Sequence, residues 1–151
     1  MKNLSKALGL LLMLSAILVM SDERAHAAAP AGHFTDRGDG TVFDNLTGLT
    51  WEVDFSVPQT RAAAVTYCNG LTATHPGAAW RVPTILELRS LIDDSAVTWM
   101  MDPLFSTTAA QQFWSATRAA RFLTYSWTVD FSTGRVDVFD GTLLGRTRCV
   151  R

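Results

Sequence analysis

Hydrophobic and polar residues alternate most regularly between Leu123 and Phe131. The odd-numbered positions of this stretch are aromatic or aliphatic: Tyr125, Trp127, Val129 and Phe131. The even-numbered positions are polar: Thr124, Ser126, Thr128 and Asp130. A period of two is typical of a strand with one buried face. We therefore predict a strand over residues 123–131 whose aromatic side chains, including Trp127, belong to the core.

Shorter apolar runs bounded by turn residues predict further strands. These are His33–Asp36, Thr41–Asp44, Leu49–Glu52, Gln112–Thr117, Arg135–Phe139 and a closing strand, Arg146–Arg151. The dipeptide Asp39-Gly40 is a strong hairpin signal, and Asn45–Gly48 and Ser132–Gly134 supply two more turns. The strands are short and joined by tight turns, which indicates antiparallel pairing.

A first helix is predicted over Pro58–Asn69. Proline suits a first turn, and Gly70 is placed where a C-terminal cap is wanted. Val65 and Cys68 fall on one face, with Leu71 just beyond, so we expect Cys68 to point inward.

A second helix is predicted to begin at Thr84, after a short strand over Trp80–Val82. Thr84 and Glu87 have the spacing of a capping box, in which each side chain accepts a hydrogen bond from a free backbone N–H of the first turn. The apolar positions that follow recur at helical spacing: Ile85, Leu88, Leu91 and Ile92. This face is expected to be buried.

The apolar loop Trp99–Phe105 allows two interpretations. It either folds onto the core or stays exposed as a binding surface. We favour a loop that folds onto the core.

The N-terminus has the pattern of a secretory signal peptide. Lys2 and Lys6 precede an apolar run, Ala7–Met20, and Ala25–Ala27 supplies the small residues of a cleavage site. A retained anchor needs about 20 apolar residues, and this run is shorter. We predict a signal peptide over residues 1–27, a short leader over 28–32 and one domain over 33–151, in a periplasmic or secreted product with no membrane span after cleavage.

Charge and cysteine content refine this picture. Cleavage after Ala27 reduces 13 basic and 14 acidic residues to 10 and 12, so the net charge is about −2. Such a small charge does not by itself suggest a nucleic-acid or membrane partner. Two cysteines in an exported chain are expected to pair, and a Cys68–Cys149 bond closing roughly 80 residues would stabilise the fold by about 4 kcal/mol. The alternative, free or catalytic thiols, has no CxxC motif to support it.

Candidate ligand-binding residues gather in the C-terminal third. They are Arg118, Arg121, Arg135, Asp137, Asp140 and Arg146. Arginine binds sulfate, carboxylate or phosphate bidentately. The alternative is a solvated face on which these arginines pair with neighbouring aspartates. Trp99, Trp114 and Trp127 could stack on sugar rings, although aromatic residues at strand spacing are more often core.

Other chemistry has weaker support. Asp36, Asp39 and Asp44 crowd the first turns, where aspartate usually bonds its own backbone, and the bidentate glutamate of a calcium loop is missing. His33 and His75 lie in no catalytic motif, so a hydrolase is not favoured. We expect no metal and no cofactor.

The order of motifs is similar to that of a known family. GDGTVFDNLTGLTWE, YCNGL, WRVPTILELRSLID, FWSAT, YSWTVDFSTGRV and RCVR resemble the DUF1566 family, also called the Lcl C-terminal domain, from about Phe34 to Arg151. The resemblance implies an α+β, C-type lectin-like domain: two helices packed on short antiparallel strands, with a disulfide from the first helix to the last strand. It places ligand-binding loops within roughly Ser106–Gly145 and associates adhesin members with glycans. The collagen-like stalk of those adhesins and the EPN, QPD and WND motifs of calcium-dependent lectins are missing here.

These observations give one leading functional expectation. We expect an exported, non-catalytic domain that recognises an extracellular glycan or a surface protein, with a second copy of the chain as a further candidate partner in a homo-oligomer. The alternative is a structural or assembly subunit of a bacterial envelope complex that uses the Trp99–Phe105 loop as its contact.

Overall fold

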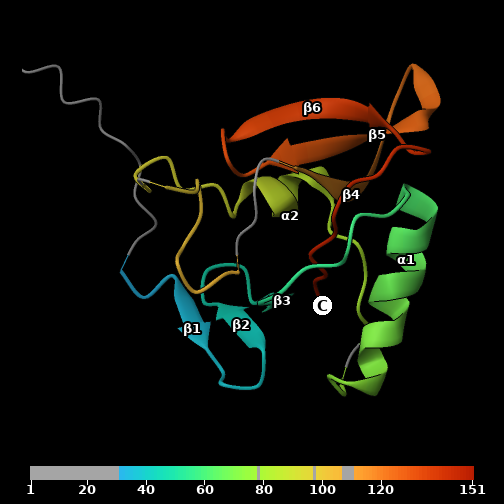
Figure 1. Cartoon of the computed structure of the whole chain (residues 1–151). Helices are drawn as coiled ribbons and strands as arrows, with labels where there is room; N and C mark the ends of the chain where they lie inside the picture. The colour runs from blue at the N-terminus through green and yellow to red at the C-terminus, as the bar shows by residue number, and fades with distance from the viewer. Residues whose placement is uncertain (1–30, 78, 97, 107–110) are drawn as a thin grey trace, which may run out of the picture.

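The computed structural model describes residues 31–77, 79–96, 98–106 and 111–151, and it is an α+β fold with two three-stranded antiparallel sheets (Figure 1). The first sheet contains β1 (Phe34–Asp36), β2 (Thr41–Asp44) and β3 (Thr50–Glu52). The second contains β4 (Gln112–Ala119), β5 (Phe122–Asp130) and β6 (Arg135–Asp140). The helices are α1 (Arg61–Gly70), the 3-10 turn η1 (Leu71–Ala73) and α2 (Ile85–Arg89). The signal peptide predicted over residues 1–27 lies outside the described residues.

The first sheet forms by the turn chemistry that its sequence predicts. Its strands pair in the order β1-β2-β3, and Gly40 (φ +80°) and Gly48 (φ +75°) take the left-handed conformation in the two turns. Asp39 accepts a hydrogen bond from the backbone N–H of Thr41 at 3.0 Å, and Asp44 accepts one from that of Leu46 at 2.9 Å. The three strand predictions in this region are therefore confirmed.

The second sheet has a separate group of buried residues on each face. Phe113, Val129 and Phe131 pack into a core with α2 and the first sheet. Trp114 packs on the other side, in a smaller core around the Cys68–Cys149 disulfide. Figure 1 shows α2 between the two sheets and α1 beside the second sheet.

This two-sided packing overturns the prediction for Trp127. The strand exists as expected, but Trp127 is 36% exposed, whereas the polar neighbours Ser126 and Thr128 are fully buried. Thr128 is accommodated because its hydroxyl donates to Gln112 Oε1 at 2.7 Å. Alternation identified the two faces correctly, but both faces are covered over only part of their length.

Both predicted helices are present, with corrections to α1 and to the end of α2, which stops at Arg89 before Leu91 and Ile92. The capping box of α2 forms, with Thr84 as N-cap and Glu87 completing it. Helix α1 begins after Thr60 rather than at Pro58, and Gly70 is still helical (φ −72°) rather than a left-handed cap. Cys68 is buried as predicted. The buried face of the helix runs through Ala64 and Cys68, and Val65 is 40% exposed.

The Trp99–Phe105 loop lies in the core, as favoured. Met101 and Phe105 are each 3% exposed, and the backbone N–H of Met100 donates to the carbonyl of Phe131 at 2.8 Å. Trp99 packs against the same core.

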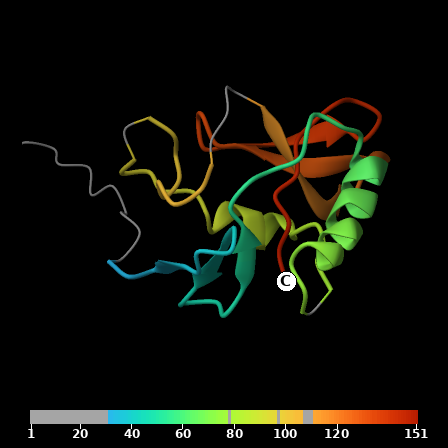
Figure 2. The ribbon, with the colours of Figure 1, turned by 60° about the horizontal axis from the view of Figure 1, so that its bottom comes forward.

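The closing strand is not a regular ladder strand. Residues 146–151 are extended and make isolated bridges from Val150 to Trp51 and Arg81 and from Arg146 to Phe113. Both views place the chain end between the first sheet and α1 (Figures 1 and 2). The short strand predicted over Trp80–Val82 is likewise a single bridge, at Arg81.

The disulfide predicted between Cys68 and Cys149 is present. Both cysteines are fully buried, and the bond joins helix α1 to the extended C-terminal segment. None of the helices in the described part of the chain is long and apolar enough to cross a membrane.

Candidate ligand-binding site

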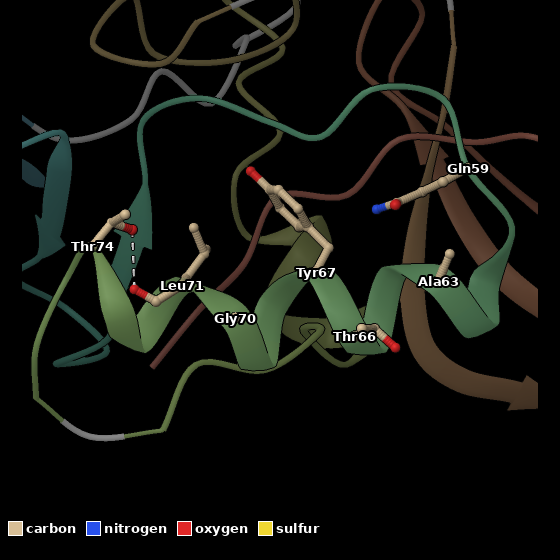
Figure 3. A pocket seen from close by; sticks show the side chains of 7 residues that line it. All are labelled: Gln59, Ala63, Thr66, Tyr67, Gly70, Leu71 and Thr74. Atoms are coloured by element: carbon tan, nitrogen blue, oxygen red, sulfur yellow. Dashed lines mark hydrogen bonds between the residues drawn. The ribbon is translucent and has the colours of Figure 1, made fainter.

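An open pocket of about 600 Å³ runs along one face of helix α1 (Figure 3). It is lined by Gln59, Ala63, Thr66, Tyr67, Gly70, Leu71 and Thr74. Spacings of three and four residues place these side chains on one side of the helix. The small residues Ala63 and Gly70 leave room above it, and a Cβ added at Gly70 would meet no atom within 4 Å.

Tyr67 is the aromatic wall of the pocket, and its orientation is fixed. Its hydroxyl donates a hydrogen bond to Glu52 Oε1, and Glu52 is only 4% exposed. The other oxygen, Oε2, accepts from the backbone N–H of Cys149 at 3.1 Å. Burial raises the pKa of the Glu52 carboxyl, and burial together with the bond to Glu52 raises the pKa of Tyr67. The ring is therefore held by a buried pair that links α1 to β3.

Arg148 lies deeper in the same network. It is fully buried, and its guanidinium donates to the carbonyls of Glu52 at 2.9 Å, of Val53, and of Ser106 at 2.6 Å. Its Cζ lies 4.8 Å from the ring centroid of Phe105. Burial lowers the pKa of Arg148 to about 10. This arginine joins the end of β3 to the loop before β4 and so supports the region behind Tyr67.

Gln59 forms one end of the pocket and has a rigid backbone. Its N–H donates to the Gly145 carbonyl at 2.8 Å, and its carbonyl accepts from Gly145 N–H and from Trp114 Nε1, both at 2.9 Å. Figure 3 shows its carboxamide extending toward Tyr67. The amide nitrogen Nε2 is buried and has no hydrogen-bond partner among the described residues. A ligand acceptor reached by rotation of this side chain would satisfy that donor.

Among the described residues, those that line the pocket carry no charge, so the pocket suits an uncharged ligand. An aromatic ring, aliphatic groups, hydroxyls and a carboxamide favour a molecule with an apolar face and several hydroxyl groups. The signal for this surface in the sequence is the spacing of three and four along α1, which indicates a face of the helix but not whether another part of the chain covers it.

The arginine and aspartate residues expected to bind ligand do not form one site. Arg118, Arg121 and Asp140 lie at the end of the second sheet where β5 begins. Arg118 is exposed and donates to the Leu123 carbonyl, and Arg121 is exposed in the turn between β4 and β5. Asp140 pairs with Tyr125 across the strands.

The remaining members of that set lie elsewhere. Arg135 pairs with Asp130 in the strand register, at the other end of β5, and its Nη2 lies 2.7 Å from Asp137 Oδ2. Eight strand steps of about 3.3 Å separate the two ends of β5, roughly 26 Å. Arg146 is half-buried: its Nε donates to Gln111 Oε1 and its Nη1 to the Ser56 carbonyl at 2.9 Å. These two hydrogen bonds connect the segment before β4 to the loop between β3 and α1.

The acidic turn residues and histidines have structural contacts. Asp36 accepts from the Gly38 N–H at 2.8 Å, as turn aspartates do. His33 Nε2 lies 3.1 Å from the buried Asp44 Oδ1, and His75 packs its ring edge against Trp80. Within the described ranges, no three His, Cys, Asp or Glu side chains gather as a metal site would require.

Comparison with known proteins identifies the domain. No curated protein matches the sequence. The model of one family, described as the Lcl C-terminal domain, matches residues 40–151, well over half of the chain. This span contains both helices, the disulfide and five of the six strands, and it confirms the resemblance that the motifs indicate. The chain therefore belongs to the Lcl C-terminal domain family.

Proposed function

We propose that this protein is an exported, non-catalytic domain that recognises an extracellular glycan. The observation that carries the proposal is the uncharged pocket on α1, with Tyr67 fixed beside it. A pyranose ring has an apolar C–H face that stacks on an aromatic side chain, and its hydroxyls suit carboxamide and hydroxyl partners. A volume of about 600 Å³ is in the range of small-ligand sites.

Two further features support export and a lectin-like architecture. The N-terminal sequence has the charged, apolar and small-residue regions of a signal peptide, and one disulfide suits an oxidising compartment. Two helices, two small antiparallel sheets and a bond from α1 to the C-terminal segment agree with the C-type lectin-like fold that the family resemblance implies. We include that fold in the proposal.

A surface-protein ligand is the alternative within the same proposal. The envelope-assembly alternative has less support, because Met101 and Phe105 of its expected contact loop are buried. Formation of a homo-oligomer stays a prediction.

The proposal is tested on an array of neutral, acidic and sulfated glycans at low and high salt, using oxidised protein purified after expression of the full chain. We expect neutral glycans to bind with little dependence on salt, because the described residues that line the pocket carry no charge. Ala63→Gln should weaken binding by about tenfold or more, since the added side chain enters the pocket. Ala62→Gln is the matched control: Ala62 is also exposed on α1 but does not line the pocket.

Two outcomes would contradict the proposed site. Neutral-glycan binding that survives Ala63→Gln would place the ligand elsewhere. Binding restricted to sulfated glycans, abolished by salt and by Arg118→Ala, would move the glycan site to the end of the second sheet. Failure to bind any glycan on the array would exclude a glycan as the ligand and leave a surface protein as the next candidate.

A further inference from the structure

Exposed apolar side chains concentrate at one end of the second sheet. The described part of the chain has ten large hydrophobic residues that are at least 36% exposed, and four of them lie at this end. They are Phe122 (59%), Leu123 (74%), Leu143 (47%) and Leu144 (64%). Apolar side chains gathered in this way on the surface of a domain indicate an interaction site.

Two turns bring these residues together although they are about 20 positions apart in sequence. The backbone N–H of Gly141 donates to the Thr124 carbonyl at 2.9 Å, and a Cβ at Gly141 would lie only 2.8 Å from that oxygen. The loop carrying Leu143 and Leu144 is thus held beside the β4–β5 hairpin. In Figure 1 this end lies at the upper right, where the turn between β4 and β5 projects beyond helix α1.

Arginines surround the apolar tip. Arg118 and Arg121 are exposed on the hairpin, and Arg61, at the start of α1, donates through Nη2 to the Ala116 carbonyl at 3.0 Å. Asp140 is occupied by the turn that follows it, where it accepts from the N–H of Thr142 at 2.9 Å. The tip is therefore basic, in a chain whose net charge is −1.

We propose that this end of the sheet, made of the β4–β5 turn and the loop after β6, docks on the surface of an anionic phospholipid membrane. Apolar side chains at projecting turns can enter the headgroup region, and arginines beside them attract anionic headgroups. The combination distinguishes this surface from the α1 pocket, which is uncharged and concave. The inference does not rest on the proposed glycan site.

Co-sedimentation with lipid vesicles tests the proposal, using oxidised protein from the full chain. We expect binding to vesicles of mixed phosphatidylcholine and phosphatidylglycerol and little binding to phosphatidylcholine alone. The double variant Arg118→Gln/Arg121→Gln should bind about 30-fold more weakly, from the attraction of two basic residues near an anionic surface. The double variant Leu123→Ser/Leu144→Ser should bind at least about tenfold more weakly.

The chain offers matched controls for the apolar change. Leu86 (73% exposed, on α2) and Leu46 (65% exposed, after β2) have nearly the same exposure as Leu123 and Leu144 but lie away from the tip. Leu86→Ser/Leu46→Ser and Ala63→Gln should both bind vesicles like the parent protein. Equal sedimentation with both vesicle types, no sedimentation, or equal loss in the Leu86/Leu46 control would overturn the proposal. So would binding to a soluble sulfated glycan that needs both arginines but neither leucine, because it would assign the tip to a soluble anion.

Discussion

Replacing Arg148 with methionine tests whether the buried network behind Tyr67 stabilises the fold. The side chain is fully buried and donates to three carbonyls, those of Glu52, Val53 and Ser106. Methionine fills similar space but donates no hydrogen bond, so these acceptors lose their donor and the buried Glu52 carboxyl loses its neighbouring cation.

The expected loss follows from two opposing contributions. A buried polar group that loses its partner costs about 1–3 kcal/mol, and breaking a buried charge pair typically costs about 3–5 kcal/mol. Methionine avoids the cost of burying a guanidinium, which the lowered pKa of Arg148 reflects. We expect a net decrease of about 3 kcal/mol in the free energy of unfolding.

Urea unfolding at neutral pH, followed by tryptophan fluorescence, measures this change. Arg148→Lys should also destabilise the protein, because one ammonium group cannot reproduce the planar geometry that reaches three carbonyls. The control Arg89→Met removes an exposed arginine and should change stability by less than about 0.5 kcal/mol. If Arg148→Met is as stable as the parent, the cost of burying the charge outweighs its hydrogen bonds, and our reasoning about this network is wrong.

Two other predictions concern the disulfide and the start of α2. Because Cys68 and Cys149 are 81 positions apart, replacing both with alanine should lower the free energy of unfolding by about 4.5 kcal/mol. Urea titration against the oxidised parent measures this change. A loss below about 1 kcal/mol would show that closing the loop in the unfolded chain contributes little to stability. A hydrogen bond from Arg81 lowers the pKa of Glu87 to about 2, so its stabilising contribution is present above pH 4.5 and is lost as the pH falls toward 2. Glu87→Gln should reduce the acid dependence of stability in that window, and a parent and variant with equal dependence would contradict the assignment.

Local sequence rules predicted the elements whose causes are local. Glycine and aspartate set the turns of the first sheet, and the Thr84–Glu87 spacing set the start of α2. The disulfide was predicted from the presence of two cysteines in a chain whose N-terminus has the pattern of a signal peptide. The turns and the start of α2 depend on residues close in sequence, and the disulfide pairing depends only on the number of cysteines.

The failures depend on which partner covers a face, which alternation does not encode. Trp127 has the same spacing as Val129 but lies beyond the part of the sheet that the core covers. Val65 is exposed because the disulfide core meets α1 through Ala64 and Cys68. The closing residues satisfy backbone groups on two sides, so they form bridges rather than a ladder.

The candidate sites show the same limit. Arginine content alone suggested one binding face, but two of those arginines lie at one end of β5 and a third at the other end. The pocket on α1 depends on small side chains at Ala63 and Gly70 and on the distant Glu52 that fixes Tyr67. Only the folded chain brings these groups together.

The position of the last residues has a consequence for how the protein matures. Arg151 exchanges backbone hydrogen bonds with Thr50, and Val150 does so with Arg81, so the final residues join segments made much earlier. If the chain is exported N-terminus first, Cys68 reaches the oxidising compartment long before Cys149, and no other cysteine is available to capture it within the molecule. The disulfide can then form only after Cys149 has crossed, and a truncation before Cys149 would leave Cys68 as a free thiol and one edge of β3 without its partner, while β3 would still pair with β2.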